Sequence, residues 1–473
     1  MTGGPTVAVV GGGVSGLVAA HRLRCDLGPD AEIVLLEQAD RLGGKLHSVP
    51  LAGTELDLGA EAFLARRPEV LRLADELGLA DQVVHPGPAA ARVRAGGELH
   101  PLPAGTVMGV PAHADSVAHL LSPAGLAAVR AEAELPPLHL GGADASVGGL
   151  LRSRVGDEVV DRLVEPLLGG VYAGSADGLG LRATIPALAA ALDGGAESIT
   201  AAAAAALPAP APDGVKRPVF GAFRHGYGEL VDALVKSAAA RVRLGLPVRA
   251  LRRDGTGWRL EIGSAPAPEQ LVADAVVLAV PPPSARKLLA DVVPSASELL
   301  GRIELASMAV FGLALPPGTE LPAASGTLIA RGEVHADGTP FTAKAFTFTS
   351  RKWPHLTGSG GAPLVRGSVG RSGQGELLRR TDAELLRGVL ADLREVTGVA
   401  VEPVESVVVR WGGGLPQYGV GHLDLVAEVE RAVADDGGGL ALAGAALHGV
   451  GVPACVATGE AAASGITRHL ATG

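Results

Sequence analysis

A glycine-rich turn near the start of the chain carries the clearest chemical signal. It follows an apolar, largely β-branched stretch at 6–10 and precedes a helical pattern that continues from Leu17. Such a turn permits a tight change of direction, a close approach of the backbone to a pyrophosphate, and close packing of helix on strand. The helix N-terminus adds free N–H groups and a partial positive charge. We therefore expect a dinucleotide phosphate at Gly11, Gly12, Gly13, Val14, Ser15 and Gly16.

An acidic residue stands at the spacing that such a site requires. A second apolar stretch, 31–36, ends at Glu37, which lies 21 residues after Gly16. A carboxylate there accepts hydrogen bonds from ribose hydroxyls and disfavours a 2′-phosphate. An ordinary strand–turn–helix is the alternative reading, but the full order of strand, glycines, helix, strand and acid favours a dinucleotide site.

The same β/α pattern returns in the middle and at the end of the chain, at 275–280 and 440–444. Between these pieces, 105–200 is helical by pattern and 300–410 alternates like an antiparallel sheet. We predict a two-lobed α/β protein, with a Rossmann-like dinucleotide-binding domain, an inserted antiparallel-sheet domain for substrate and a helical subdomain. The predicted boundaries are 1–64, 216–285 and 405–473 for the first, 65–103 and 286–404 for the second, and 104–215 for the third, with a linker near 200–215 in which only the alanine run offers a helical alternative.

Composition excludes several other classes of protein. The formal net charge of the 473 residues is −10, which argues against general nucleic-acid binding. The two cysteines, Cys25 and Cys455, form no Cys-x-x-Cys pair, so zinc ribbons and dithiol centres are excluded and a reduced, cytoplasmic setting fits. No cluster of His and Cys predicts a metal site.

One apolar segment, 437–459, could be mistaken for a membrane span. It contains seven glycines and Pro453, so a strand–turn–helix is the better interpretation. We expect no transmembrane helix and no signal peptide, because a strand follows almost directly after Met1. Peripheral membrane contact stays open.

Several ordered motifs resemble a known family. The stretch Glu37-x-x-x-Arg41-x-Gly43-Gly44-Lys45 resembles the flavin amine oxidase superfamily. Further motifs are similar to the protoporphyrinogen/coproporphyrinogen oxidases of porphyrin biosynthesis, and to their cytosolic bacterial branch that oxidises coproporphyrinogen III. These motifs are 57–63, 99–103, 166–174, Trp411 with 415–422, and 442–444 with 449–453.

The resemblance implies FAD as the cofactor and assigns residues to it. Glu37 and Gln38 would meet the adenosine ribose, and Val248 would bracket the adenine through its backbone. The C-terminal turn would meet the pyrophosphate and the flavin N1–O2 edge through the N–H groups of Val450, Gly451 and Val452.

The flavin end of the cofactor is assigned in the same way. Trp411 would pack near the isoalloxazine, although a tryptophan is more often a core residue. Lys45 would face the flavin, with a solvated loop charge as its alternative. The same side includes the backbone of Gly59, Ala60, Glu61 and Ala62. Arg92 lies one position from the register of an arginine that pairs with a substrate propionate in some relatives.

The implied reaction removes six electrons from a porphyrinogen in three flavin cycles, with O2 as acceptor and H2O2 as by-product. Hydride would pass from a meso carbon to flavin N5, so no side-chain acid or base is required. The sequence does not separate coproporphyrinogen from protoporphyrinogen. A flavin amine oxidase, a carotenoid desaturase and a non-enzymatic FAD-holding protein are the alternatives, and a ferrochelatase is a candidate partner.

Overall fold

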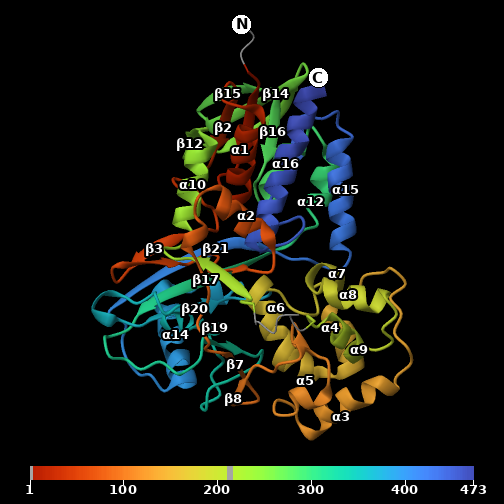
Figure 1. Cartoon of the computed structure of the whole chain (residues 1–473), viewed down its shortest axis with the longest axis vertical. Helices are drawn as coiled ribbons and strands as arrows, with labels where there is room; N and C mark the ends of the chain where they lie inside the picture. Colours follow the sequence, from red (N-terminus) through yellow and green to blue (C-terminus); the bar gives the residue numbers. More distant parts are fainter. Residues whose placement is uncertain (1–3, 210–216, 473) are drawn as a thin grey trace.

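A five-stranded parallel sheet joins three distant parts of the chain in the computed structural model, which describes residues 4–209 and 217–472 (Figure 1). Every neighbouring pair in this sheet is parallel. The predicted α/β class with a Rossmann-like core is thereby confirmed. The strand order is β12 (Arg241–Arg243), β2 (Glu32–Leu36), β1 (Thr6–Val10), β16 (Ala275–Leu278) and β22 (Leu440–Leu442).

Both faces of this sheet are covered. In β1, Val7 and Val9 belong to one core cluster and Ala8 and Val10 to another, as the two-residue repeat of a strand requires. Strands buried on both faces need to be apolar throughout, which explains their sequence. The first face carries α1 (Val14–Leu27), α2 (Pro68–Glu76), α10 (Gly228–Ala238) and α16 (Val452–Thr472), and the second carries β13 (Val248–Asp254), β14 (Gly257–Ser264), β15 (Ala267–Ala273), α11 (Pro282–Leu289), α12 (Pro294–Leu300) and α15 (His422–Ala434).

A seven-stranded sheet forms the second lobe, below the parallel sheet in Figure 1. All its pairs are antiparallel except β18 with β7, and α14 (Asp382–Thr397) packs on one face. Its order is β21 (Glu405–Pro416), β17 (Leu305–Ala314), β20 (Leu364–Val369), β19 (Ala343–Thr347), β18 (Gly326–Ile329), β7 (Ala91–Ala95) and β8 (Glu98–Pro101). β21 pairs with β17 along its length, so residues 405–416 belong to the second sheet, whereas the predicted boundary at 405 assigns them to the dinucleotide-binding domain.

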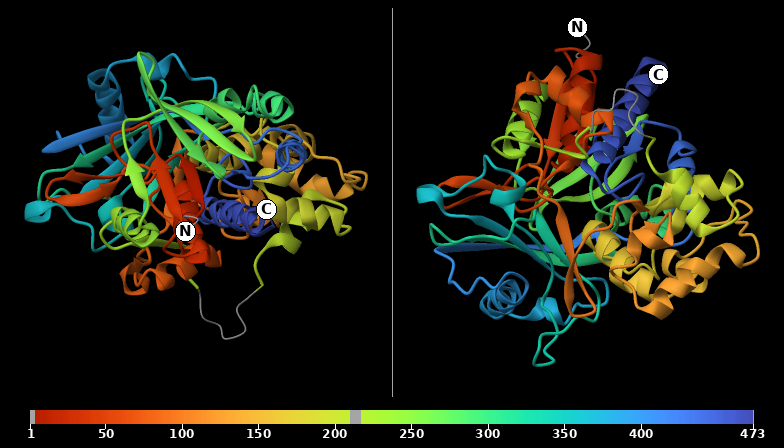
Figure 2. Two further views of the ribbon diagram at one scale, coloured as in Figure 1. Left: turned by 90° about the horizontal axis from the view of Figure 1, so that it is seen from above. Right: turned by 60° about the horizontal axis from the view of Figure 1, so that its bottom comes forward.

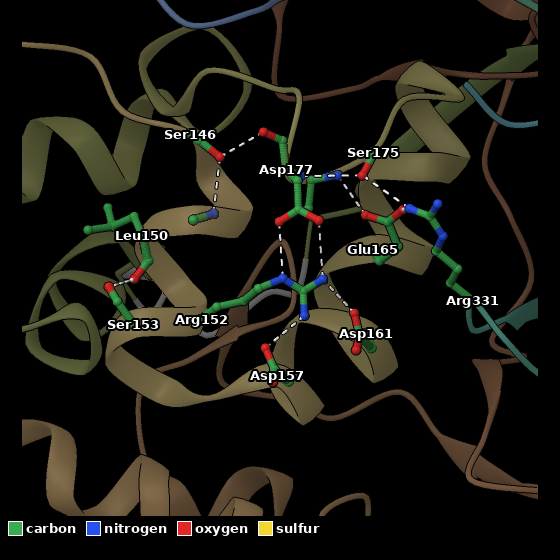
Figure 3. Close-up of polar contacts among 12 residues, drawn as sticks. Ser146, Leu150, Arg152, Ser153, Asp157, Asp161, Glu165, Ser175, Asp177 and Arg331 are labelled. Carbon is green, nitrogen blue, oxygen red and sulfur yellow. Dashed lines mark hydrogen bonds and ion pairs between the residues drawn. The ribbon is translucent and has the colours of Figure 1, made fainter. Parts of the chain in front are cut away.

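A helical lobe lies beside the seven-stranded sheet in both views of Figure 2. Its helices share one core cluster. Arg152 ties three of its segments together by ion pairs to Asp157, Asp161 and Asp177 (Figure 3). The helices are α3 (Pro123–Ala131), α4 (Val147–Val155), α5 (Asp157–Val159), α6 (Glu165–Tyr172), α7 (Leu181–Thr184), α8 (Pro186–Asp193) and α9 (Ile199–Ala206), with a π-helical turn at Val160–Val164.

For the first part of the linker predicted near 200–215 the structure shows the helical alternative offered for the alanine run, because α9 occupies Ile199–Ala206. Ser198 caps this helix by accepting a hydrogen bond from Ala201 N, and Ala202 and Ala203 are buried in the helical core. A cap and a small-residue face are sufficient to hold an alanine run against neighbouring helices. Residues 210–215 of that prediction lie outside the described residues.

The apolar segment 437–459 divides into β22, a turn and the first turns of α16, as the sequence predicts. Among the described residues, no helix combines the length and the apolar character that are needed to cross a bilayer.

Close packing of α1 on the sheet generates the first prediction. A Cβ at Gly16 would lie 1.9 Å from the carbonyl oxygen of Gly11, so α1 must move if a side chain is added. Gly16→Ala should destabilise the fold by about 2 kcal/mol and lose bound cofactor, as overpacking does. Gly465→Ala is the control, since nothing lies within 4 Å of that Cβ in α16. Urea unfolding and the absorbance of the purified protein report both effects, and equal behaviour of the two variants would contradict the packing argument.

Candidate functional site

A cavity of about 380 Å³ opens at the carboxyl ends of the parallel strands, where ligands bind in open α/β sheets. Its wall comes from all three pieces of chain that build the sheet. Most of the residues expected to hold a cofactor line it, namely Gly11, Gly13, Val14, Ser15, Glu37, Gln38, Lys45, Ala60, Val248, Trp411, Val450 and Val452. Six expected residues lie behind or beside the wall, namely Gly12, Gly16, Gly59, Glu61, Ala62 and Gly451.

The N-terminus of α1 faces this cavity without a side-chain cap. Gly13 is the N-cap residue of α1, and the first turn of the helix contains no acidic residue. Gly13, Val14 and Ser15 line the cavity. The N–H groups of a first helical turn have no partner within the helix, so they are available to an anion. A Cβ at Gly13 would meet nothing closer than 4.0 Å, which leaves this side of the backbone open to a ligand.

A second glycine turn braces the first. Gly43 N donates to Gly12 O at 2.8 Å, and a Cβ at Gly44 would lie 3.0 Å from Gly13 Cα. Both Gly43 and Gly44 have positive φ, which favours glycine. The motif that follows Glu37 therefore supports the phosphate loop from behind.

The Glu37 carboxylate hydrogen-bonds to the glycine-rich loop and also lines the cavity. Its Oε2 accepts a hydrogen bond from Gly12 N at 2.7 Å, and its Oε1 accepts one from Ala39 N at 2.8 Å. A carboxylate has about four acceptor positions, so capacity remains for ribose hydroxyls. Gln38 lies beside it and is exposed.

Lys45 and Trp411 also line the cavity. Burial lowers the pKa of Lys45, and in the described part of the chain its ammonium forms no ion pair. Trp411 Nε1 donates to Leu58 O at 2.9 Å, which fixes the indole with its edge against His47. Gly59 acts by packing, because a Cβ there would lie 1.8 Å from Lys45 O.

The turn before α16 closes the cavity. Val450 and Val452 line it, whereas Gly451 is turned away and accepts a hydrogen bond from Cys455 N at 3.1 Å. Tyr418 braces the preceding segment by donating from Oη to Ala445 O at 2.5 Å. Cys455 also lines the cavity, and burial raises the pKa of its thiol to about 11, so it stays neutral.

Glu61 belongs to an ion network and does not reach the cavity. Its carboxylate contacts Lys352 at 2.8 Å, Arg366 at 3.4 Å and Trp353 Nε1 at 3.0 Å. Burial alone would raise the pKa of Glu61, but the two cations outweigh it and hold the pKa at about 2. The side chain thus fastens the loop 57–63 to the seven-stranded lobe.

Arg92 does not contact the cavity either. It is exposed on β7. Arg94, two residues further along the same strand, is buried and pairs with Glu333 at 3.4 Å and with Glu395 at 3.2 Å. Neither arginine is in position to bind a ligand in this cavity.

Sequence reasoning missed a further set of lining residues. A signal for part of it was available, because Pro281 and Pro282 directly follow a buried parallel strand, and ligands bind at such carboxyl ends. No pattern marked the irregular pairing within β21, between Trp411 and Leu415, or Leu305. The missed residues include Arg41, Ala279, Val280, Pro281, Pro282, Leu305, Gly412, Gly413, Gly414 and Pro416.

The fold and the cavity define a dinucleotide-binding protein with a second, sheet-based lobe. Residues 14–467 match the family model described as flavin containing amine oxidoreductase. The chain belongs to this family.

Named relatives cover nearly the whole chain. The coproporphyrinogen III oxidase of Mycobacterium tuberculosis is 45% identical over 466 residues, covering 98% of this chain and 97% of the relative. A structure from Exiguobacterium sp. 255-15, provisionally named protoporphyrinogen oxidase, is 31% identical with a TM-score of 0.85, and the match covers 98% of this chain and 99% of that one. Cyclohexylamine oxidase from Brevibacterium oxydans, at 17% identity and a TM-score of 0.71 over 99% and 100% of the two chains, shares the fold.

The residues present fit the FAD that this family implies. The uncapped start of α1 suits the pyrophosphate and Glu37 suits the ribose, and Val248 lines the same cavity. Lys45 and Trp411, which the family motifs would assign to the flavin ring, line this cavity too. A diphosphate and a flavin edge both gain from a nearby cation and free N–H groups.

Glu37 provides the second prediction. Glu37→Leu removes the acceptor for the ribose and leaves the Gly12 and Ala39 N–H groups unpaired, so the affinity for FAD should fall about 10- to 100-fold. Flavin fluorescence titration of the apoprotein measures this. The control is Glu32→Gln at the start of β2, the strand that Glu37 follows, since Glu32 is exposed and among the described residues its carboxylate pairs with Arg241 alone. Unchanged FAD affinity in the Leu variant would refute the ribose assignment.

Glu61 provides the third prediction, for stability against pH. Its folded pKa of about 2 lies below the ordinary value of 4.5, so its stabilising effect is complete above about pH 4.5 and is lost as pH falls toward 2. Glu61→Gln should lower the free energy of unfolding by about 3 kcal/mol at pH 7. It should also make the free energy of unfolding depend less on pH below about pH 4.5. Urea unfolding from pH 3 to 7, with exposed Glu402→Gln as the control, tests this. A parallel pair of curves for wild type and Glu61→Gln would count against the network.

Proposed function

We propose that this protein catalyses the FAD-dependent oxidation of coproporphyrinogen III to coproporphyrin III in haem biosynthesis. The observation that carries the proposal is 45% identity to a coproporphyrinogen III oxidase over nearly all of both chains. The cavity supports it, because FAD-binding residues and the sheet of the second lobe meet at one opening. Three O2 molecules accept six electrons and six protons and leave as three H2O2.

FAD, when bound, supplies the chemistry by accepting a hydride in each of three cycles. The chain positions the reacting partners and excludes water. Trp411, Val450 and Val452 line the cavity with apolar side chains, and the neutral thiol of Cys455 lines it as well. The pyrrole protons can leave to water, so the proposed reaction requires no general base.

Protoporphyrinogen IX is the second candidate substrate. It is favoured by the Exiguobacterium structure and by a chloroplastic protoporphyrinogen oxidase from rice that is 27% identical. The two substrates differ in charge, because coproporphyrinogen has four propionates and protoporphyrinogen has two. An amine oxidase is less well supported, since Trp411 is the one aromatic side chain among the described residues that line the cavity.

We place the enzyme in the cytoplasm, with a ferrochelatase as the partner that consumes its product. The sequence carries no Cys pair that would require an oxidising compartment. Metal insertion is the class of reaction that must consume a metal-free porphyrin.

The fourth prediction tests the reaction itself. Purified protein should be yellow and should convert coproporphyrinogen III into a fluorescent porphyrin faster than it converts protoporphyrinogen IX. Initial rates by fluorescence, with O2 uptake and H2O2 release in a 1:1 ratio, measure this. Faster turnover of protoporphyrinogen IX would favour the second candidate. Turnover of amines without turnover of either porphyrinogen would overturn the proposal.

A further inference from the structure

Lys344 is a buried cation at the seam between the seven-stranded sheet and α6. Only 3% of its surface is exposed. It is the extra residue of a β-bulge in β19, since Ala343 pairs with Val369 while Ala345 pairs with the adjacent Ser368. Bulges redirect a side chain out of the regular pleat, and they are common next to ligand sites.

The ammonium of Lys344 lacks an acidic partner. Nζ donates to Gly169 O in α6 at 3.0 Å, and within residues 4–209 and 217–472 it forms no ion pair. A buried ammonium without a counterion is costly, so such groups are normally paired. Burial, together with the nearby Arg371, lowers the pKa of Lys344 to about 7.

Arg371 adds a second, half-buried cation, just after β20. Its Nη2 donates to Ile329 O at 2.6 Å, and burial lowers its pKa. Glu165 is the acid whose charge reaches Arg371, but its oxygens already bind Ala176 N at 2.6 Å and Arg331 at 3.4 Å (Figure 3). Two cations, Lys344 and Arg371, therefore share the seam without a carboxylate of their own.

The seam adjoins the cavity wall through two contacts. Gly413, a lining residue, donates from N to Ser307 Oγ at 2.9 Å, and a Cβ at Gly370 would lie 3.0 Å from Ser307 O. Arg371 is the next residue in the chain. On the other side, Gln417 follows the lining residue Pro416 and donates to Tyr172 O at the end of α6. Both cations thus lie on the side of the cavity that is formed by the second lobe.

We propose that Lys344 and Arg371 together bind a carboxylate of the substrate, which under the proposed function is a propionate of the porphyrinogen. The inference rests on that function. An ammonium and a guanidinium around one carboxylate give short, charge-assisted hydrogen bonds, and the ligand supplies the negative charge that the fold leaves out. The same pair of cations favours coproporphyrinogen, with four propionates, over protoporphyrinogen, with two.

The test measures equilibrium binding of porphyrin to the FAD-loaded protein. The probes are coproporphyrin III and its tetramethyl ester, titrated by porphyrin fluorescence. Lys344→Met and Arg371→Met should each weaken binding of the free acid about tenfold or more and leave binding of the ester unchanged, as expected for a lost charge-assisted contact. Lys287→Met is the control, because Lys287 is exposed on α11. Flavin content and melting temperature are recorded for each variant.

The outcomes separate this inference from the proposed function. Wild type that binds and oxidises porphyrinogens, with both Met variants binding the free acid as tightly as wild type, would overturn the carboxylate site alone. Equal weakening of acid and ester, with a lower melting temperature, would also overturn it, because that pattern indicates a structural role at Gly169. Wild type that binds neither porphyrin overturns the proposed function and this inference together.

Discussion

The contact between Gly16 and the carbonyl of Gly11 is the constraint on which the rest of the structure depends. Only glycine allows α1 to lie this close to the turn after β1, where a Cβ would be 1.9 Å from an oxygen. The same closeness directs the free N–H groups of α1 into the cavity. One steric requirement thus sets both the packing of the parallel sheet and the place where a phosphate binds.

Charge is distributed unevenly between the two lobes around this centre. Glu61 secures the loop beside the cofactor cavity by pairing with Lys352 and Arg366 of the second lobe, so these half-buried cations are balanced. Within the described residues, Lys344 and Arg371 form no ion pair with an acid, although the charge of Glu165 reaches Arg371. The contrast indicates that the fold balances such cations where the chain needs rigidity and leaves charge unbalanced where an anionic ligand can enter.

Sequence alone was sufficient for features that depend on local pattern. The glycines of residues 11–16, the acid at Glu37 and the apolar strands follow from chain geometry over a few residues, and the structure brings Gly11, Gly13 and Glu37 to one cavity. Contacts between distant segments could not be predicted in this way. The ion pairs of Glu61, the bulge at Lys344 and the membership of β21 in the second sheet each depend on a partner far along the chain. The composition of the alanine run of α9 is compatible with a linker and with a helix, because its burial against other helices is not visible in the sequence.

The order of strands in the two sheets has a consequence for synthesis of the protein. In the parallel sheet, β1 is synthesised first and pairs with β16, and β16 pairs with β22. In the second sheet, β7 pairs with β18, and β21 at one edge pairs with β17. Neither sheet can close until most of the polypeptide has emerged from the ribosome. Early strands must therefore wait with open edges, which is a slow and aggregation-prone condition.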